Sequence, residues 1–118
     1  MMKFSIYSKG TLVGYSNLEH GDPPMGVAHG AFVPEDGYAL IRGECAANHA
    51  DQSALELSAR TTTGAVIECV GVGILDYSAE AGESFAEVNV LGIPYPLYGE
   101  LFPSHVKAYE DQFSANRS

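Results

Sequence analysis

One stretch near the middle of the chain constrains the fold most, because it carries the clearest two-strand pattern. Apolar residues alternate with polar ones over residues 55–61, which is the period of a half-buried strand. Residues 66–75 are rich in β-branched side chains, and Thr63-Gly64 between the two runs is typical of a tight turn. We therefore predict a hairpin, in which Leu57 lies opposite Val70.

A second hairpin is predicted at the N-terminus. Residues 3–8 and 11–18 are both strand-like, and Lys9-Gly10 between them suits a short turn. A two-residue loop pairs Ile6 with Val13 and places large apolar side chains on one face. That face is expected to point into the core.

The rest of the chain completes an α+β pattern. Further strands are predicted over residues 26–33 and 84–91, and helices over residues 34–47 and 102–113. Residues 92–99 are expected to be extended, because prolines alternate there with large side chains. The order is three strands, a helix, three strands and a helix. It predicts one α+β domain over residues 1–118. The domain is expected to have a mostly antiparallel sheet of about six strands, whose curvature the sequence leaves open, and two helices that cover it. Residues 114–118 are expected to be a frayed tail.

The charge is strongly acidic, with 15 acidic residues against 6 basic ones and a net charge of −9. No lysine or arginine occurs between Thr61 and Val106. Such a field repels nucleic acid, because binding there depends on neutralising phosphates with basic groups. It attracts a basic protein or a cationic ligand, although solubility alone is an equally good explanation.

Known chemical motifs are missing from the sequence. There is no GxSxG nucleophile elbow, no GxxxxGK[ST] phosphate loop and no complete dinucleotide motif, so we assign no catalytic residue, cofactor or metal. No run approaches the ~18 apolar residues of a membrane-spanning helix, and the first residues lack the apolar core of a signal peptide. We expect a cytoplasmic protein without membrane contact, and the sequence leaves open whether it forms a homo-oligomer.

Two interpretations of function follow. In the first, a small acidic domain occupies a basic protein surface, as an immunity or antitoxin protein occupies a nuclease site, with acidic side chains in place of phosphates and tyrosines as anchors. The predicted partner-binding residues are Glu68, Asp76, Glu80, Glu83, Glu87, Tyr95 and Tyr98.

In the second interpretation, the chain is a small enzyme or a metal- or ligand-binding domain with its site in an unusual loop. Pro23-Pro24 fixes the backbone there, and the loop carries Glu19, His20, Asp22 and, slightly later, His29. His20 or His29 would serve as the base or ligand and Asp22 as its orienting partner. The spacing matches no recognised metal motif, and turn-forming roles explain the same residues without chemistry.

Overall fold

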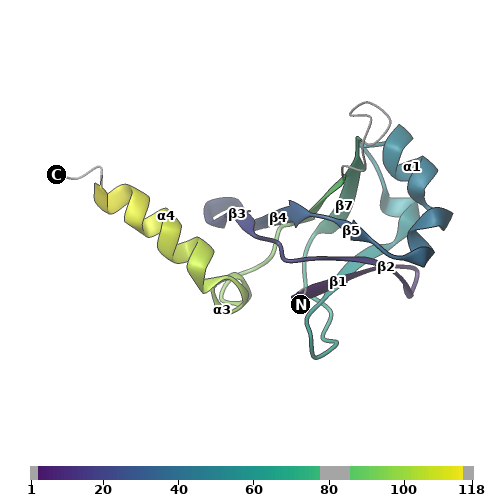
Figure 1. The fold of residues 1–118 in the computed structure, drawn as a ribbon. Coiled ribbons are helices and arrows are strands. Elements are labelled where there is room, and N and C mark those ends of the chain that lie inside the picture. The colour runs from purple at the N-terminus through teal and green to yellow at the C-terminus, as the bar shows by residue number, and fades with distance from the viewer. Residues whose placement is uncertain (1–2, 78–85, 116–118) are drawn as a thin grey trace.

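The structure is a computed structural model that describes residues 3–77 and 86–115, the last three by their backbone alone. In this part of the chain, two antiparallel sheets of four strands each are accompanied by short helices (Figure 1). The predicted α+β class is therefore confirmed, with two sheets in place of one sheet of about six strands. Both sheets contribute to one cluster of buried residues, which includes Ile6, Val13, Ile74, Val88 and Val90.

The first sheet has the strand order β5-β2-β1-β6. Its strands are β1 (Phe4–Ser8), β2 (Thr11–Ser16), β5 (Val33–Pro34) and β6 (Leu57–Arg60). The predicted N-terminal hairpin is confirmed, but a bulge shifts its register so that Ile6 faces Gly14. The predicted pairing of Ile6 with Val13 is wrong, because a bulge inserts one extra residue into a strand. Both side chains are nevertheless buried.

The second sheet has the strand order β3-β4-β8-β7. Its strands are β3 (His20–Asp22), β4 (Val27–Ala31), β7 (Gly71–Asp76) and β8 (Ala86–Leu91). Strands β7 and β8 pair with each other, with Val72 opposite Val90 and Ile74 opposite Val88. Part of the predicted loop at Glu19 forms the edge strand β3, followed by the short 3-10 helix η1 (Pro23–Met25).

The predicted central hairpin forms only at its turn. Gly64 has a φ of 90°, and Arg60 bridges Val66 beyond it. The Val70 N–H then donates to the Leu91 carbonyl, so the chain has left the first sheet and joined the second. The predicted pairing of Leu57 with Val70 is wrong, because β8 supplies the longer partner for the second run. Leu55 lies in the 3-10 helix η3 (Ser53–Leu55) and not in a strand.

The predicted helix over residues 34–47 consists of two pieces, the 3-10 helix η2 (Asp36–Leu40) and the α-helix α1 (Arg42–Ala47). Tyr38 is buried, and its hydroxyl donates to a carboxylate oxygen of Asp76 on β7 at 2.5 Å. Burial, together with this bond, raises the pKa of Tyr38 well above its ordinary range. The phenol therefore ties η2 to the second sheet.

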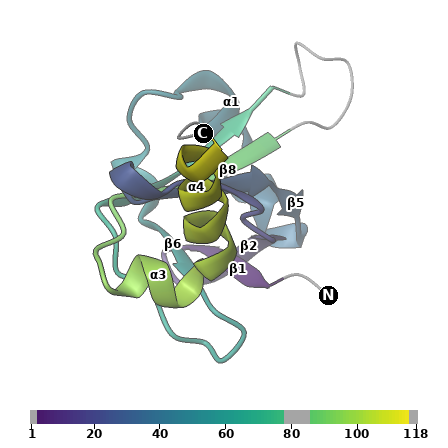
Figure 2. The same cartoon turned by 90° about the vertical axis from the view of Figure 1, so that its left-hand side faces the viewer.

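The C-terminal segment begins as predicted and then departs from the prediction. Residues 92–96 are irregular, α3 (Leu97–Leu101) follows, and α4 (Pro103–Ala115) confirms the second predicted helix. However, α4 projects away from the sheets (Figure 1). Figure 2 looks along this helix from its C-terminal end. It contacts β3 at the edge of the second sheet, η1 and α3, and its Val106 packs against the core. Among the described residues, no helix has the length and apolar character needed to cross a membrane.

Candidate functional site

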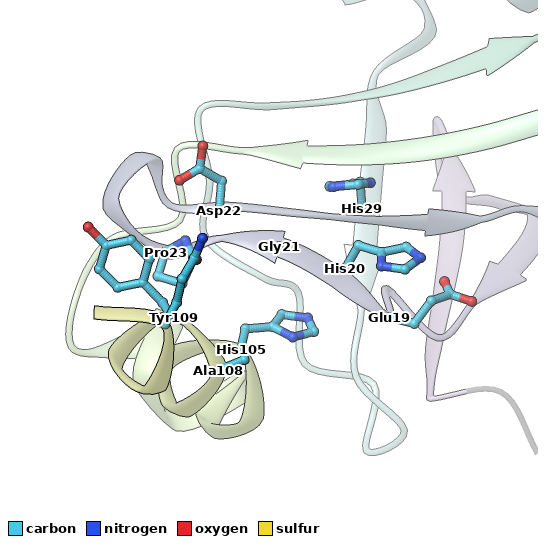
Figure 3. A pocket seen from close by; sticks show the side chains of 10 residues that line it. Glu19, His20, Gly21, Asp22, Pro23, His29, His105, Ala108 and Tyr109 are labelled. Carbon is cyan, nitrogen blue, oxygen red and sulfur yellow. The ribbon is translucent and has the colours of Figure 1, made fainter. Parts of the chain in front are cut away.

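A groove of about 620 Å³ follows β3, the edge strand of the second sheet, where α4 meets it (Figure 3). All four residues of the predicted ligand or acid-base site line this groove, namely Glu19, His20, Asp22 and His29. Gly21, Pro23, His105, Ala108, Tyr109 and Gln112 complete the described lining. The structure therefore brings the predicted set together and adds side chains from α4.

His20 and His29 form a cross-strand pair. They lie directly opposite each other in β3 and β4, and their ring centroids are 5.4 Å apart. Ala28 and Gly30, their neighbours in β4, are buried, so alternation along the strand directs the two imidazoles to the outer face of the sheet. Two groups that can donate or accept a proton are thus presented side by side at the groove.

The carboxylate beside His29 comes from Glu87 on β8. His29 Nδ1 lies 3.7 Å from Glu87 Oε1, and this nitrogen is buried without a hydrogen-bond partner. The sequence predicts Asp22 as the orienting partner, but Asp22 lies opposite Val27, two residues from His29 along β4. A carboxylate next to one ring nitrogen orients a histidine, so Glu87 takes the place that we expected for Asp22.

Glu19 has a structural task in addition to its place in the groove. Its Oε1 accepts the Ala31 N–H at 3.0 Å, which extends the pairing beyond the end of β3. A Cβ atom at Gly30 would collide with this carboxylate and approach the Glu19 backbone nitrogen to 3.0 Å. Glycine at position 30 therefore allows Glu19 to fold back over β4.

His105 is a groove residue that the sequence did not reveal. Its Nε2 lies 2.8 Å from the Leu18 carbonyl oxygen, and its ring stacks on that of Phe102 at 5.1 Å. A Cβ atom at Gly21 would meet both His105 and the Tyr98 hydroxyl, so glycine lets α4 dock against β3. One signal was present in the sequence, because a residue three positions after Phe102 shares its helix face.

Two of the five predicted partner-binding residues that the structure describes are not at the surface. Asp76 and Tyr98 are buried; Asp76 accepts the Tyr38 hydroxyl and the Tyr98 hydroxyl donates to the Val27 carbonyl. Neither side chain can contact a partner in this conformation. Glu68 and Tyr95 are exposed, and Glu87 is half-buried beside His29. Glu80 and Glu83 lie outside the described residues.

Metal ligation has little geometric support in the described part of the chain. No three His, Cys, Asp or Glu side chains are grouped there as ligands for one ion. His105 Nε2 already contacts a carbonyl oxygen, and a Glu19 oxygen accepts a backbone N–H. The groove instead presents carboxylates, imidazoles and the half-exposed Tyr109 to whatever lies along β3.

Comparison of the chain with protein-family models, with curated proteins and with solved structures finds no match.

Proposed function

We propose that this domain binds a partner protein by holding a basic, extended segment of it along β3. The observation that carries the proposal is the combination of an edge strand with an acidic groove. All three residues of β3 are exposed, and among the described residues that line the groove none is lysine or arginine. An edge strand offers unpaired backbone groups to an added strand, and Glu19 and Asp22 would attract its basic side chains.

An exposed apolar surface beside the groove favours a protein over a small molecule. Tyr95 is exposed, and its hydroxyl donates to the carbonyl of Pro23, a groove residue. Met25 follows Pro23 within η1 and is exposed. Val70, which directly precedes β7, and Leu91, the last residue of β8, are also exposed and are joined by a backbone hydrogen bond. Exposed apolar residues with a polar rim are typical of interfaces.

An immunity or antitoxin protein that occupies a basic nuclease surface is the kind of protein that this proposal describes. The net charge of −9 would speed association with such a partner. Of the residues predicted for this role, Glu68 and Tyr95 remain in the proposed surface, Glu68 two positions before Val70. A cytoplasmic location belongs to the same proposal, and fractionation of native cells tests it.

The experiment is affinity capture from native cells, washed at low and then moderate salt, with two matched pairs of variants. Asp22→Asn removes a groove charge, and Asp111→Asn removes a charge on α4 that pairs with Lys107. Val70→Ser alters a side chain that is 87% exposed in the proposed surface, and Leu40→Ser alters one that is 81% exposed on η2. We expect the unaltered domain to retain one stoichiometric basic protein at low salt and to release it at moderate salt. Asp22→Asn and Val70→Ser should lose this protein, whereas Asp111→Asn and Leu40→Ser should retain it.

Equal retention by both members of each pair would remove the groove and its apolar neighbours from the interface. A binding segment that contacts β3 should also protect the backbone amides of residues 20–22 from hydrogen exchange in the complex. Unchanged exchange at these amides would contradict the added strand.

A small-molecule or acid-base site is the second candidate, and one observation favours it. His29 Nδ1 is buried without a hydrogen-bond partner beside Glu87, an arrangement that would orient the other ring nitrogen toward a ligand. Thermal shift with a panel of metal ions and metabolites tests this function. Stabilisation that His29→Gln abolishes would support it, and a panel without any shift would leave the protein-binding proposal alone.

A further inference from the structure

The outer face of the first sheet carries a cleft that the proposed function does not use. Ser5 on the central strand β1 lies between Tyr15 on β2 and Arg60 on β6, and all three are partly exposed. A small residue between two large ones leaves a depression in the sheet surface. The cleft has a volume of about 280 Å³, and Tyr7 and Lys3 are among the residues that line it.

The Arg60 guanidinium stacks on a tyrosine beside this cleft. Its guanidinium carbon lies 3.9 Å from the centroid of the Tyr7 ring, which also lines the cleft. Its Nε atom is buried and has no hydrogen-bond partner. A guanidinium that stacks on an aromatic ring keeps its N–H groups free for a carboxylate or phosphate in its plane.

The charge of the cleft is opposite to that of the molecule. Lys3 lines it and Arg60 lies next to it, whereas the described lining residues include no aspartate or glutamate. Two of the six basic residues of a chain with a net charge of −9 thus meet at one place. Hydroxyl donors complete the lining at Ser5, Thr61 and Thr62. Local positive charge and hydroxyl groups are what an anionic group requires.

We propose that this cleft binds a flat aromatic ring that carries a carboxylate or phosphate group. Tyr15, beside Ser5 on β2, supplies the aromatic surface against which the ring of the ligand would lie, and Tyr7, two positions along β1, holds the Arg60 guanidinium. Arg60 and Lys3 supply the charge for the anionic group. This site is independent of the acidic groove at β3, which attracts the opposite charge.

Two probes represent the two anionic groups: adenosine monophosphate for the phosphate and indole-3-acetate for the carboxylate. Backbone amide shifts in NMR spectra report where each probe binds, at concentrations up to about 10 mM because a cleft of this size implies millimolar affinity. At least one probe should shift residues 3–7, 12–15 and 60–62 in a saturable way. Adenosine lacks the anionic group and inorganic phosphate lacks the ring, so each should bind about tenfold more weakly than adenosine monophosphate.

Arg60→Gln should weaken the bound probe about tenfold, since a charge-assisted hydrogen bond is lost. Arg42→Gln is the matched control, because Arg42 also lies over a tyrosine, with 5.1 Å between its guanidinium carbon and the Tyr38 ring, but on α1. If Arg60→Gln does not fold, Lys3→Gln changes an exposed side chain of the same cleft. The absence of saturable shifts with both probes, shifts elsewhere in the protein, or equal affinity in the Arg60 and Arg42 variants would overturn the proposal.

Discussion

At the scale of single residues, the groove depends on two positions where only a hydrogen atom fits. Gly21 admits the Tyr98 hydroxyl and the His105 ring, and Gly30 admits the Glu19 carboxylate. Each close contact holds a polar group that also makes a hydrogen bond, Tyr98 to Val27 and Glu19 to Ala31. Both contacts lie on the face of the β3–β4 pair opposite His20 and His29, because Gly21 pairs with Ala28 and Gly30 follows two residues later on β4.

Gly30→Ala should lower the free energy of unfolding by about 1 to 3 kcal/mol, because the new methyl group displaces the Glu19 carboxylate and leaves the Ala31 N–H without its acceptor. Urea denaturation measures the change. Gly71→Ala on β7 is the control, since a Cβ atom there meets nothing within 4 Å. In a Glu19→Ala background the cost of Gly30→Ala should fall, and strictly additive effects would contradict the proposed contact.

The Tyr98 hydroxyl predicts an alkaline dependence of stability. Burial, with smaller contributions from Tyr95 and Asp22, raises the pKa of Tyr98 to about 12. An unfolded tyrosine ionises near pH 10, so unfolding releases a proton between about pH 10 and 12 and stability falls there by up to ~1.4 kcal/mol per pH unit. Below pH 10 this contribution is fully present.

Tyr98→Phe removes that titration and should flatten the decline, while costing about 1 kcal/mol at neutral pH through the lost bond to Val27. The pKa of Tyr38 is also raised by burial, so Tyr38 still contributes its own decrease of stability with rising pH in this variant. Urea denaturation at neutral pH and near pH 11 gives both quantities. A slope identical to that of the unaltered protein would show that Tyr98 ionises as readily when folded as when unfolded.

At the scale of elements, one glutamine closes the free edge of β7. Gln52 is buried, and its amide both donates to the Ile74 carbonyl and accepts the Ile74 N–H, each at 2.7 Å. This pair of bonds imitates a neighbouring strand at an edge that has none in the described chain. An edge that is capped in this way is less open to pairing with another chain.

Gln52→Leu should therefore destabilise the protein by about 2 to 4 kcal/mol, because two backbone groups of Ile74 lose their partners. Hydrogen exchange at the Ile74 amide should accelerate in the same variant. Gln112→Leu makes the same chemical change at an exposed position of α4, where no such bonds are lost. Its free energy of unfolding should lie within about 0.5 kcal/mol of that of the unaltered protein. A Gln52 variant as stable as the Gln112 variant would show that water replaces the amide at no cost.

Local elements were predictable where neighbouring residues decide them. The turn at Lys9-Gly10 and the turn at Gly64 both form where the sequence predicts them. The path after Ile67 was not predictable, because two strands compete for the run 71–76 and the better partner, β8, lies further along the chain. Likewise, the four loop residues could be grouped from the sequence, but the docking of α4 beside them depends on the space above Gly21.

At the scale of the whole molecule, the shape departs from that of a compact domain. The radius of gyration is 14.8 Å, where a compact chain of this length would have about 13.5 Å. The projecting helix α4 accounts for the long axis of 49 Å (Figure 1). Its first turns are held at Phe102 and His105, whereas the described side chains from Glu110 onward are exposed.

The end of α4 should therefore be the least protected helix segment in hydrogen exchange. A helix of 13 residues is marginal on its own, and docking stabilises only its first turns. We expect amides after Tyr109 to exchange within about tenfold of unprotected rates, and the Val88 amide in the second sheet to exchange far more slowly. Exchange measured by NMR at two protein concentrations also tests for self-association. Strong protection at the higher concentration alone would mean that a second copy covers α4, and strong protection at both would contradict the free helix end.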